Sequence, residues 1–239
     1  MNIQRLNSHD HAKLRVKQDF SEYRKTIYSP VLLPEFRKLQ GTYPIVFTKP
    51  SDGNTYQPVA LFGLQAEENL FINDSVWESP HLPLFIERGP LLIGTATKDE
   101  GDSSGENFVA INTNHKNVSY DEGRWLFNND GSNTEHLNHL TNVLKQIHSS
   151  VQTTENFVNL LSMHDLITPL TLRIPLTKGH GAELTGLYAI DEEKLECTSQ
   201  DTLIQLHKSG FLMASHMMIA SMAQVSHLIN LKNHRIEQA

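Results

Sequence analysis

The stretch YPIVFT at residues 43–48 and the stretch VALFGL at residues 59–64 decide the fold class of this chain. Both are rich in β-branched and aromatic residues, which are enriched in β-strands. The segment between them, residues 49–58, contains proline, aspartate, glycine and asparagine, which are the residues of hairpin turns. A third short run, LFI, follows at residues 70–72. We therefore predict that these three runs form an antiparallel meander.

Beyond Trp125 the period of the apolar residues changes from two residues, which indicates strands, to about 3.6 residues, which indicates helices. Ser132 lies three residues before Glu135, which is the spacing of a capping box, and apolar residues at helical spacing follow it. We predict further strands at residues 91–96, 108–111, 167–176 and 184–190. We predict helices at residues 35–40, 82–87, 132–147, 153–164, 198–209 and 211–233.

The predicted fold class is α+β, with an antiparallel β-rich N-terminal half packed with C-terminal helices in a single compact domain. The β-rich part covers residues 1–127, and the mainly helical part covers residues 132–239 with a hairpin near 167–190. No internal repeat or interdomain linker divides the 239 residues. The acidic, serine- and glycine-rich loop at residues 98–105 is predicted to be exposed and mobile.

Charge and composition exclude several classes of function. The chain carries 27 acidic and 20 basic residues, for a net charge of −7. Its densest basic stretch, residues 5–25, is interrupted by acidic residues, whereas nucleic-acid binding needs a clustered basic face. We therefore expect no nucleic-acid partner. The most apolar segment, residues 211–231, contains histidine, glutamine and asparagine, so we also expect no membrane insertion.

The single cysteine, Cys197, cannot form an internal disulfide and excludes a thiolate-rich zinc site. The first 20 residues contain no apolar core of the kind that a signal peptide requires. We therefore expect a cytoplasmic protein in a reducing compartment.

Histidine is unusually frequent, with 13 residues. On a strand, His9 and His11 would point to the same face and could share a metal ion, although such a site needs a third ligand. We name His9 and His11 as metal-ligand candidates, against the alternative of an exposed polar segment. His136 and His139 form another pair with chelating spacing, for which a solvated helix face is the alternative.

Three more histidines, His216, His227 and His234, fall on one face of the predicted last helix. At a rise of about 1.5 Å per residue, the first two lie roughly 16 Å apart and cannot hold one ion. The sequence also lacks a phosphate-binding glycine frame, a GxSxG elbow and an HExxH frame. No cofactor is therefore predicted, and no catalytic residue is named.

Aromatic and arginine residues gather near prolines and turns. Such rigid side chains suit a binding pocket or an interface, and core packing is the alternative for the two tryptophans. The candidates for a pocket or interface are Trp77, Phe85, Arg88, Arg124 and Trp125.

Several segments of the sequence occur together in one known pattern. They are YPIVF at residues 43–47, residues 61–64, ENLF at residues 68–71, Trp77, Pro83 and ERGP at residues 87–90. Further matches, from His11 to the residues around Gly210, extend the pattern over nearly the whole chain. With these segments the chain resembles the SapC-like family of bacterial proteins.

The resemblance implies a limited set of functional expectations. The family takes its name from a bacterial surface-layer system, and its members occur beside tryptophan-halogenase-like proteins, cupin-like proteins and TonB-dependent receptors. A peptide-transporter permease of the same name is unrelated. The family offers no established catalytic residues to transfer to this chain.

Two functions follow as hypotheses. The first is a non-catalytic accessory protein that binds a protein or peptide partner, in bacterial surface-protein or modification systems associated with tryptophan-halogenase-like enzymes. The alternative is an iron-dependent oxygenase-type enzyme with a histidine and carboxylate site, suggested by the surplus of histidines. The sequence leaves a homodimer open.

Overall fold

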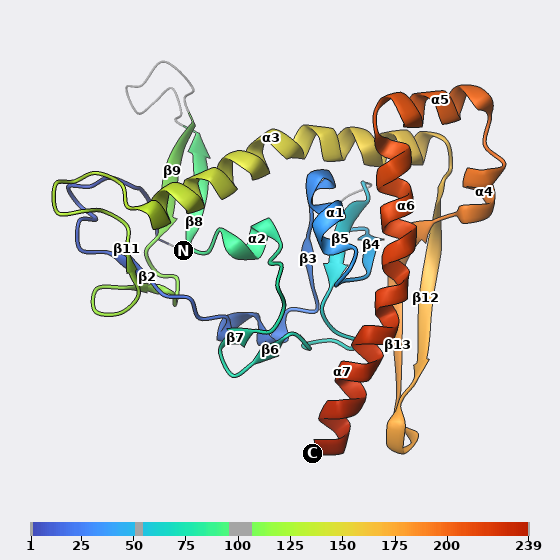
Figure 1. Ribbon diagram of the computed structural model, residues 1–239, viewed down its shortest axis with the longest axis horizontal. Helices are drawn as coiled ribbons and strands as arrows, with labels where there is room; N and C mark the ends of the chain where they lie inside the picture. The colour runs from blue at the N-terminus through green and yellow to red at the C-terminus, as the bar shows by residue number, and fades with distance from the viewer. Residues whose placement is uncertain (1, 51–54, 96–106, 239) are drawn as a thin grey trace. The chain divides into compact units, whose positions relative to one another are not determined.

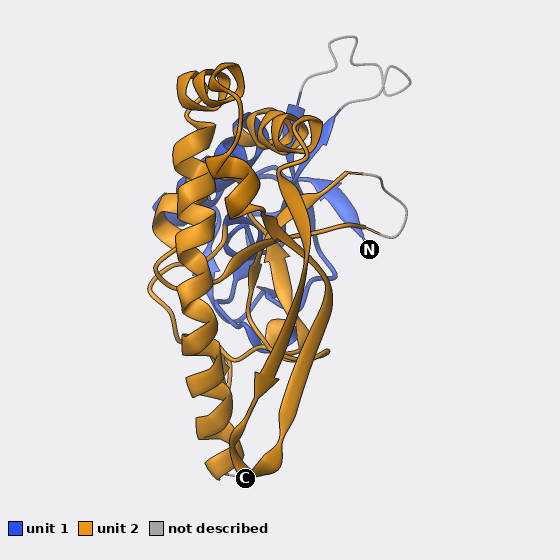
Figure 2. Ribbon diagram, turned by 90° about the vertical axis from the view of Figure 1, so that its right-hand side faces the viewer, with its two compact units in different colours: residues 1–22, 84–149 blue, residues 23–83, 150–239 orange. Residues whose placement is uncertain are grey.

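The computed structural model describes residues 2–50, 55–95 and 107–238. The chain divides into two compact units (Figure 2), of which unit 1 comprises residues 1–22 and 84–149, and unit 2 comprises residues 23–83 and 150–239. The chain is a mixed α+β protein with antiparallel sheets in its N-terminal part and most of its helices in its C-terminal part, as the sequence predicts. That it is one domain stays a prediction. The acidic loop at 98–105 lies outside the described residues.

Unit 1 contains two small antiparallel sheets. The first has the order β1-β9-β8 and consists of β1 (Ile3–Arg5), β8 (Leu91–Thr95) and β9 (Asn107–Asn112). The second has the order β10-β2-β11 and consists of β2 (Arg15–Val16), β10 (Val118–Ser119) and β11 (Arg124–Trp125). The short helix α2 (Leu84–Glu87) and the first half of the long helix α3 (Glu135–Met163) complete the unit.

One apolar cluster holds the two sheets and α3 together within unit 1. Its buried members come from β2, β8, β9, the segment after β11 and the first turns of α3, and they are Leu14, Val16, Leu91, Ile111, Leu126, Phe127, Leu137, Leu140 and Leu144. Because residues three and four apart lie on one helix face, α3 turns a continuous leucine stripe toward these strands.

Unit 2 is built on a five-stranded antiparallel sheet of order β12-β13-β4-β5-β3. Its strands are β3 (Tyr28–Pro30), β4 (Ile45–Thr48), β5 (Gln57–Leu61), β12 (Ile167–Pro175) and β13 (Gly181–Ile190). A separate hairpin consists of β6 (Ile72–Asn73) and β7 (Val76–Trp77). Its helices, besides the second half of α3, are α1 (Phe36–Leu39), α4 (Glu192–Glu196), α5 (Gln200–Lys208), α6 (Phe211–Ser221) and α7 (Val225–Gln238).

Short 3-10 turns link these elements. They are η1 (Ser21–Lys25), η2 (Leu33–Glu35), η4 (Thr177–Gly179) and η5 (Met222–Gln224). The turn η1 contains the point where the chain passes from unit 1 into unit 2.

The core of unit 2 is centred on Phe157 of α3. Its ring centroid lies 5.9 Å from that of Phe36, 6.3 Å from that of Phe47 and 5.5 Å from that of Phe211. These rings belong to α1, β4 and α6, so a single buried side chain joins four elements. The pairs with Phe36 and Phe211 are edge-to-face, and such packing stabilises a core by about 0.5–1.5 kcal/mol per pair beyond the burial of area.

The helices α6 and α7 run alongside the β12–β13 hairpin (Figure 1). Asn233 of α7 accepts a hydrogen bond from the backbone of Thr177, at 2.9 Å, and Lys178 donates to the carbonyl of Ile236, at 2.9 Å. Ser221 at the end of α6 accepts from the backbone of Ile45, at 2.8 Å. These contacts fix the C-terminal helices to both the hairpin and the central strand β4.

The structure corrects several predicted element boundaries. The third predicted strand of the meander, at residues 70–72, does not join β4 and β5, because β6 begins at Ile72 and pairs only with β7. The helices predicted at 132–147 and 153–164 are the single helix α3, since no glycine or proline interrupts the residues between them.

The helix caps and the last helix also differ from prediction. Thr134, not Ser132, accepts the hydrogen bond from the backbone of Leu137 at the start of α3. Ser199, one residue after the predicted position, caps α5. The predicted helix 211–233 is interrupted by η5 and continues to Gln238. Among the described residues, no helix has both the length and the apolar character that a membrane crossing requires.

Candidate functional site

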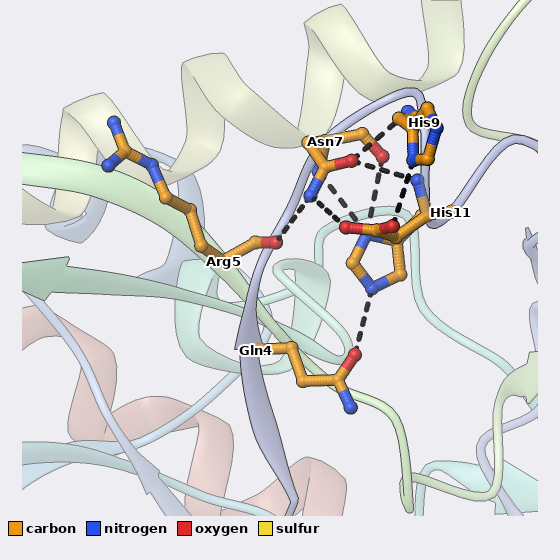
Figure 3. A network of polar contacts seen from close by, with 6 residues as sticks. Gln4, Arg5, Asn7, His9 and His11 are labelled. Carbon is orange, nitrogen blue, oxygen red and sulfur yellow. Dashed lines mark hydrogen bonds and ion pairs between the residues drawn. The ribbon is translucent and has the colours of Figure 1, made fainter.

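The N-terminal histidines lie on a turn rather than on a strand (Figure 3). The side chain of His9 is 97% exposed and its Nδ1 lies 3.0 Å from Oδ1 of Asp10. The side chain of His11 is buried, and its Nε2 lies 3.1 Å from Oε1 of Gln4. The two imidazoles therefore do not share a face. The expectation of a common face was wrong because it assumed an extended backbone.

Asn7 organises this turn. Its Oδ1 accepts hydrogen bonds from the backbones of His9, at 3.0 Å, and Asp10, at 2.9 Å, and its Nδ2 donates to Asp10, at 2.9 Å. The hydrogen bonds from His9 and Asn7 lower the pKa of Asp10 below its usual value. No group of three or more His, Cys, Asp or Glu side chains within the described ranges is placed to hold a metal ion. The metal role of His9 and His11 stays a prediction.

The other histidine sets do not converge either. His139 contacts Glu87 of α2, with 2.8 Å between Nε2 and Oε1. His136 is half-buried, and its Nε2 makes no hydrogen bond with any described residue. Burial, and then the charge of Arg124, lower the pKa of His136. The last three histidines, His216, His227 and His234, are predicted to lie on one face of a single helix. They do not lie on one regular helix, because η5 interrupts it between His216 and His227.

Of the predicted pocket residues, Trp77 is a core residue of unit 2. Its Nε1 donates to the hydroxyl of Tyr43, at 2.9 Å, and that hydroxyl donates to the carbonyl of His81, at 2.7 Å. Its ring packs against Phe62, with centroids 5.0 Å apart. Burial raises the pKa of Tyr43 to about 12, so this hydroxyl keeps its proton and serves as a structural link. Trp77 thus follows the core-packing alternative.

Phe85 and Arg88 lie at α2, and both are half-buried. Cζ of Arg88 lies 6.0 Å from the ring centroid of Phe85, and its Nη1 donates to the carbonyl of Leu91, at 2.8 Å. The pKa of His115 is lowered mainly by burial, and the charge of Arg88 lowers it further. Arg88 therefore helps to join α2 to β8.

Arg124 and Trp125 form β11, and Trp125 is 43% exposed. Trp125 pairs directly with Arg15 of β2, whose Cζ lies 3.8 Å from the ring centroid. The guanidinium is oriented by a second bond, from Nη1 to the carbonyl of Asp121, at 2.8 Å. The guanidinium of Arg124 makes no hydrogen bond or ion pair with any described residue. Tyr120, in the preceding loop, is 64% exposed.

We define the arginine–tryptophan surface of unit 1 as Arg15, Tyr120, Arg124 and Trp125. Sequence reasoning identified Arg124 and Trp125 but missed Arg15 and Tyr120. The pairing of Arg15 with Trp125 depends on strand register between distant segments, and no local pattern marks it.

Four of the five predicted residues lie in unit 1, as the pair Phe85 and Arg88 near α2 and the pair Arg124 and Trp125 in β11. Glu87, the residue before Arg88, contacts His139 of α3. The charge of Arg124 lowers the pKa of His136, which lies one helical turn before His139. Trp77 belongs to unit 2.

Unit 2 has a pocket of its own that the sequence did not indicate. Its volume is about 550 Å³. It is lined from η1, the segment up to β7, and the end of α7, by Arg24, Asn69, Leu70, Ile72, Asn73, Asp74, Glu78, Leu231, His234, Arg235 and Gln238. Because three separate segments contribute, no contiguous motif could have predicted it.

The model of one protein family, SapC, matches residues 6–228. The chain belongs to the SapC family. No curated protein and no solved structure matches it. The match confirms the family resemblance seen in the sequence.

The SapC match covers both units of the chain. All five predicted pocket or interface residues lie inside the matched range, as does Arg15. The α7 residues that line the unit 2 pocket, from Leu231 onward, lie beyond it.

Proposed function

We propose that this SapC-family chain is a non-catalytic accessory protein that binds a protein or peptide partner through the arginine–tryptophan surface of unit 1. The observation that carries the proposal is the exposed indole of Trp125, which is stacked on the guanidinium of Arg15.

The chemistry of this surface is that of interaction hot spots. Tryptophan, tyrosine and arginine are enriched at the energetic centres of protein interfaces, because they bury large areas at little cost in conformational entropy. Trp125 exposes an aromatic ring that lies against the guanidinium of Arg15, and Tyr120, in the loop before β11, is also exposed. The stacked Arg15 holds the indole in one orientation, which reduces the ordering that binding requires.

The charge of the surface indicates the kind of partner. The guanidinium of Arg124 has no carboxylate among the described residues, while Glu122 pairs with Lys17 at 3.6 Å. A partner segment with an acidic side chain beside an apolar one would place a carboxylate on Arg124 and an apolar group on Trp125. Arginine binds a carboxylate through two parallel hydrogen bonds, which adds specificity.

The histidine–glutamate pairs described in unit 1 support the non-catalytic part of the proposal for this unit. Two histidine–glutamate pairs occur among the described residues of unit 1, His115 with Glu22, at 2.9 Å, and His139 with Glu87, at 2.8 Å. In the described part of the chain neither imidazole is bonded to a serine, threonine or cysteine side chain. A nucleophile activated by a positioned base is therefore missing from both.

The family resemblance suggests the setting. We place the partner in a bacterial surface-protein or modification system, in the company of tryptophan-halogenase-like enzymes. The test is affinity capture from a lysate of the source organism, with the wild-type chain and Trp125→Ala compared in parallel. Tyr28→Ala, which removes an exposed aromatic residue from unit 2, is the matched control.

The proposal predicts that one protein is captured by the wild type and by Tyr28→Ala and is lost with Trp125→Ala. Equal capture by all three chains would contradict it. So would a wild-type chain that captures no protein and runs as a monomer in size-exclusion chromatography.

A further inference from the structure

The pocket of unit 2 has walls that are held in place by α7. Arg235 donates to the carbonyl of Asn69, at 3.0 Å, and to that of Ile72, at 2.8 Å. One turn earlier, Lys232 forms a largely buried ion pair with Glu68, at 2.5 Å. Two cationic side chains at i and i+3 therefore fasten the helix to the segment that forms the opposite wall.

On the side formed by η1, the charges of the pocket are already balanced. Nε of Arg24 donates to the backbone carbonyl of Asp74, at 2.7 Å, and Nη2 lies 3.7 Å from the carboxylate of the same residue. Asp74 has a φ of 51°, in the left-handed region that aspartate tolerates better than most residues. This turn directs its carbonyl at Arg24.

Two charges in the pocket remain uncompensated. Arg235 bonds to backbone carbonyls, and no described carboxylate pairs with it. Glu78 accepts a hydrogen bond from Nδ2 of Asn73, at 3.0 Å, and no described cation pairs with it. Since Arg235 is anchored on Ile72 and Glu78 on Asn73, the opposite charges flank the same two-residue strand, β6.

From this arrangement we propose that the pocket of unit 2 binds a zwitterionic ligand, an amino acid or short peptide with a free carboxylate and a free ammonium group. The carboxylate lies against Arg235, with His234 beside it, and the ammonium group lies against Glu78. This site is separate from the arginine–tryptophan surface and goes beyond the function proposed for it.

The alternatives fit the lining less well. A simple anion such as phosphate would meet the carboxylates of Asp74 and Glu78 in the same space. An apolar ligand would remove water from charged groups without replacing their hydrogen bonds, which is costly. The volume of about 550 Å³ falls within the range of roughly 300–1,000 Å³ that is typical of small-molecule sites.

The test is isothermal titration calorimetry of the full chain with tri-alanine, N-acetyl-tri-alanine and tri-alanine amide. Tri-alanine is expected to bind, and each blocked form to bind about tenfold more weakly, because each lacks one charge-assisted hydrogen bond. Free alanine serves as a further probe. Binding of alanine as tight as that of tri-alanine assigns the site to amino acids, and weaker binding assigns it to peptides.

Variants locate the two charges. Glu78→Gln keeps an acceptor for Asn73 but removes the negative charge. It should therefore weaken the binding of tri-alanine and of tri-alanine amide about tenfold, because both carry a free ammonium group, and leave the binding of N-acetyl-tri-alanine unchanged. Arg235→Gln should abolish the difference between tri-alanine and its amide. The exposed ion pair of Arg173 and Glu183 on the β12–β13 hairpin supplies matched controls, Arg173→Gln and Glu183→Gln, which should leave the affinity unchanged.

Three results would overturn the proposal. One is the absence of any heat of binding with alanine and tri-alanine in the tens of millimolar range. Another is equal affinity for the free and the blocked peptides. The third is binding of inorganic phosphate that Glu78→Gln strengthens, since this would identify a site for anions. Thermal melting of each variant checks that it is folded. If Arg235→Gln does not fold, Glu78→Gln together with the blocked peptides still tests the proposal.

Discussion

Arg15 lies directly opposite Trp125 across the β2–β11 pair, with its guanidinium carbon 3.8 Å from the centroid of the indole. The two strands are only two residues long, so register alone does not hold this pair. The loop before β11 lies against β2 as well: a Cβ added at Gly123 would come within 2.6 Å of the backbone of Val16. The stacked pair therefore depends on a close backbone approach that only glycine permits.

Replacing Trp125 should abolish partner binding while changing the stability of the fold only slightly. Because the ring is partly exposed and its main contact is one cation, Trp125→Ala should lower the free energy of unfolding by only about 1 kcal/mol. Partner capture should nevertheless be lost, and Trp125→Phe should retain part of it. Urea denaturation and affinity capture measure the two effects. A loss of several kcal/mol would instead make Trp125 a structural residue.

Gly123→Ala should destabilise unit 1. Its φ of 104° is unfavourable for alanine, and the added methyl group would overlap the backbone of Val16. We expect a loss of about 2–4 kcal/mol in urea denaturation, from strain and overlap together. Gly131→Ala is the control, because Gly131 also has a positive φ, of 81°, but its nearest neighbouring atom would be 3.5 Å away. Similar losses for both variants would refute the overlap.

The ion pair between Lys232 and Glu68 is the most buried of the ion pairs described in unit 2. The side chains are 13% and 9% exposed, and Glu68 also accepts from the backbone of Leu64, at 2.9 Å. Lys232→Met should cost about 3–5 kcal/mol, because it leaves a buried carboxylate without its cation. Glu68→Gln combined with Lys232→Met should recover part of this loss. A double-mutant cycle from chemical denaturation measures the coupling, and additive single effects would contradict it.

The stability of unit 1 should fall as the pH drops below neutrality. Burial is the main cause that lowers the pKa values of His115 and His136 below the ordinary 6.5, so both are neutral when folded and gain protons more readily when unfolded. Their stabilisation is present above pH 6.5 and is lost as the pH falls through the folded values. Glu22 opposes this effect at His115, and Arg88 reinforces it.

Denaturation midpoints between about pH 5 and pH 7.5 test this slope. His136→Gln should flatten it, whereas His180→Gln, on the exposed turn of the β12–β13 hairpin, should not. The carboxyl groups of Asp10 and Asp130 have lowered pKa values, so they contribute stability above pH 3.8 that is lost as the pH falls below 3.8. This range is separate from that of the histidines. Stability that rises between pH 7.5 and pH 5 would show that the ion pair with Glu22 outweighs burial.

Local patterns predicted most elements well. The alternation in residues 167–176 and 184–190 predicted the hairpin of β12 and β13, and the glycine at 210 marked the end of α5 with a φ of 76°. The same reasoning failed where a decision was not local. The run at 70–72 had strand composition, but whether it joined β5 depended on its neighbours in space.

The candidate site was predictable only in part. Residue type singled out Arg124 and Trp125, because exposed aromatic and arginine side chains near turns suit recognition. It could not distinguish Trp125, which is 43% exposed, from Trp77, which is buried. Nor could it identify Arg24, Glu78 and Arg235 as neighbours, since each stands in an unremarkable local context.

The amino-acid sequence by itself determined the α+β class, most of the helices and strands, and membership of the SapC family, because periodicity, turn residues and family patterns are carried by residues close together in the chain. Only the tertiary structure decided that Arg15 stacks on Trp125 and that Glu78 and Arg235 face one pocket. These contacts between distant residues depend on strand register and helix docking, which are set by the packing of a whole core.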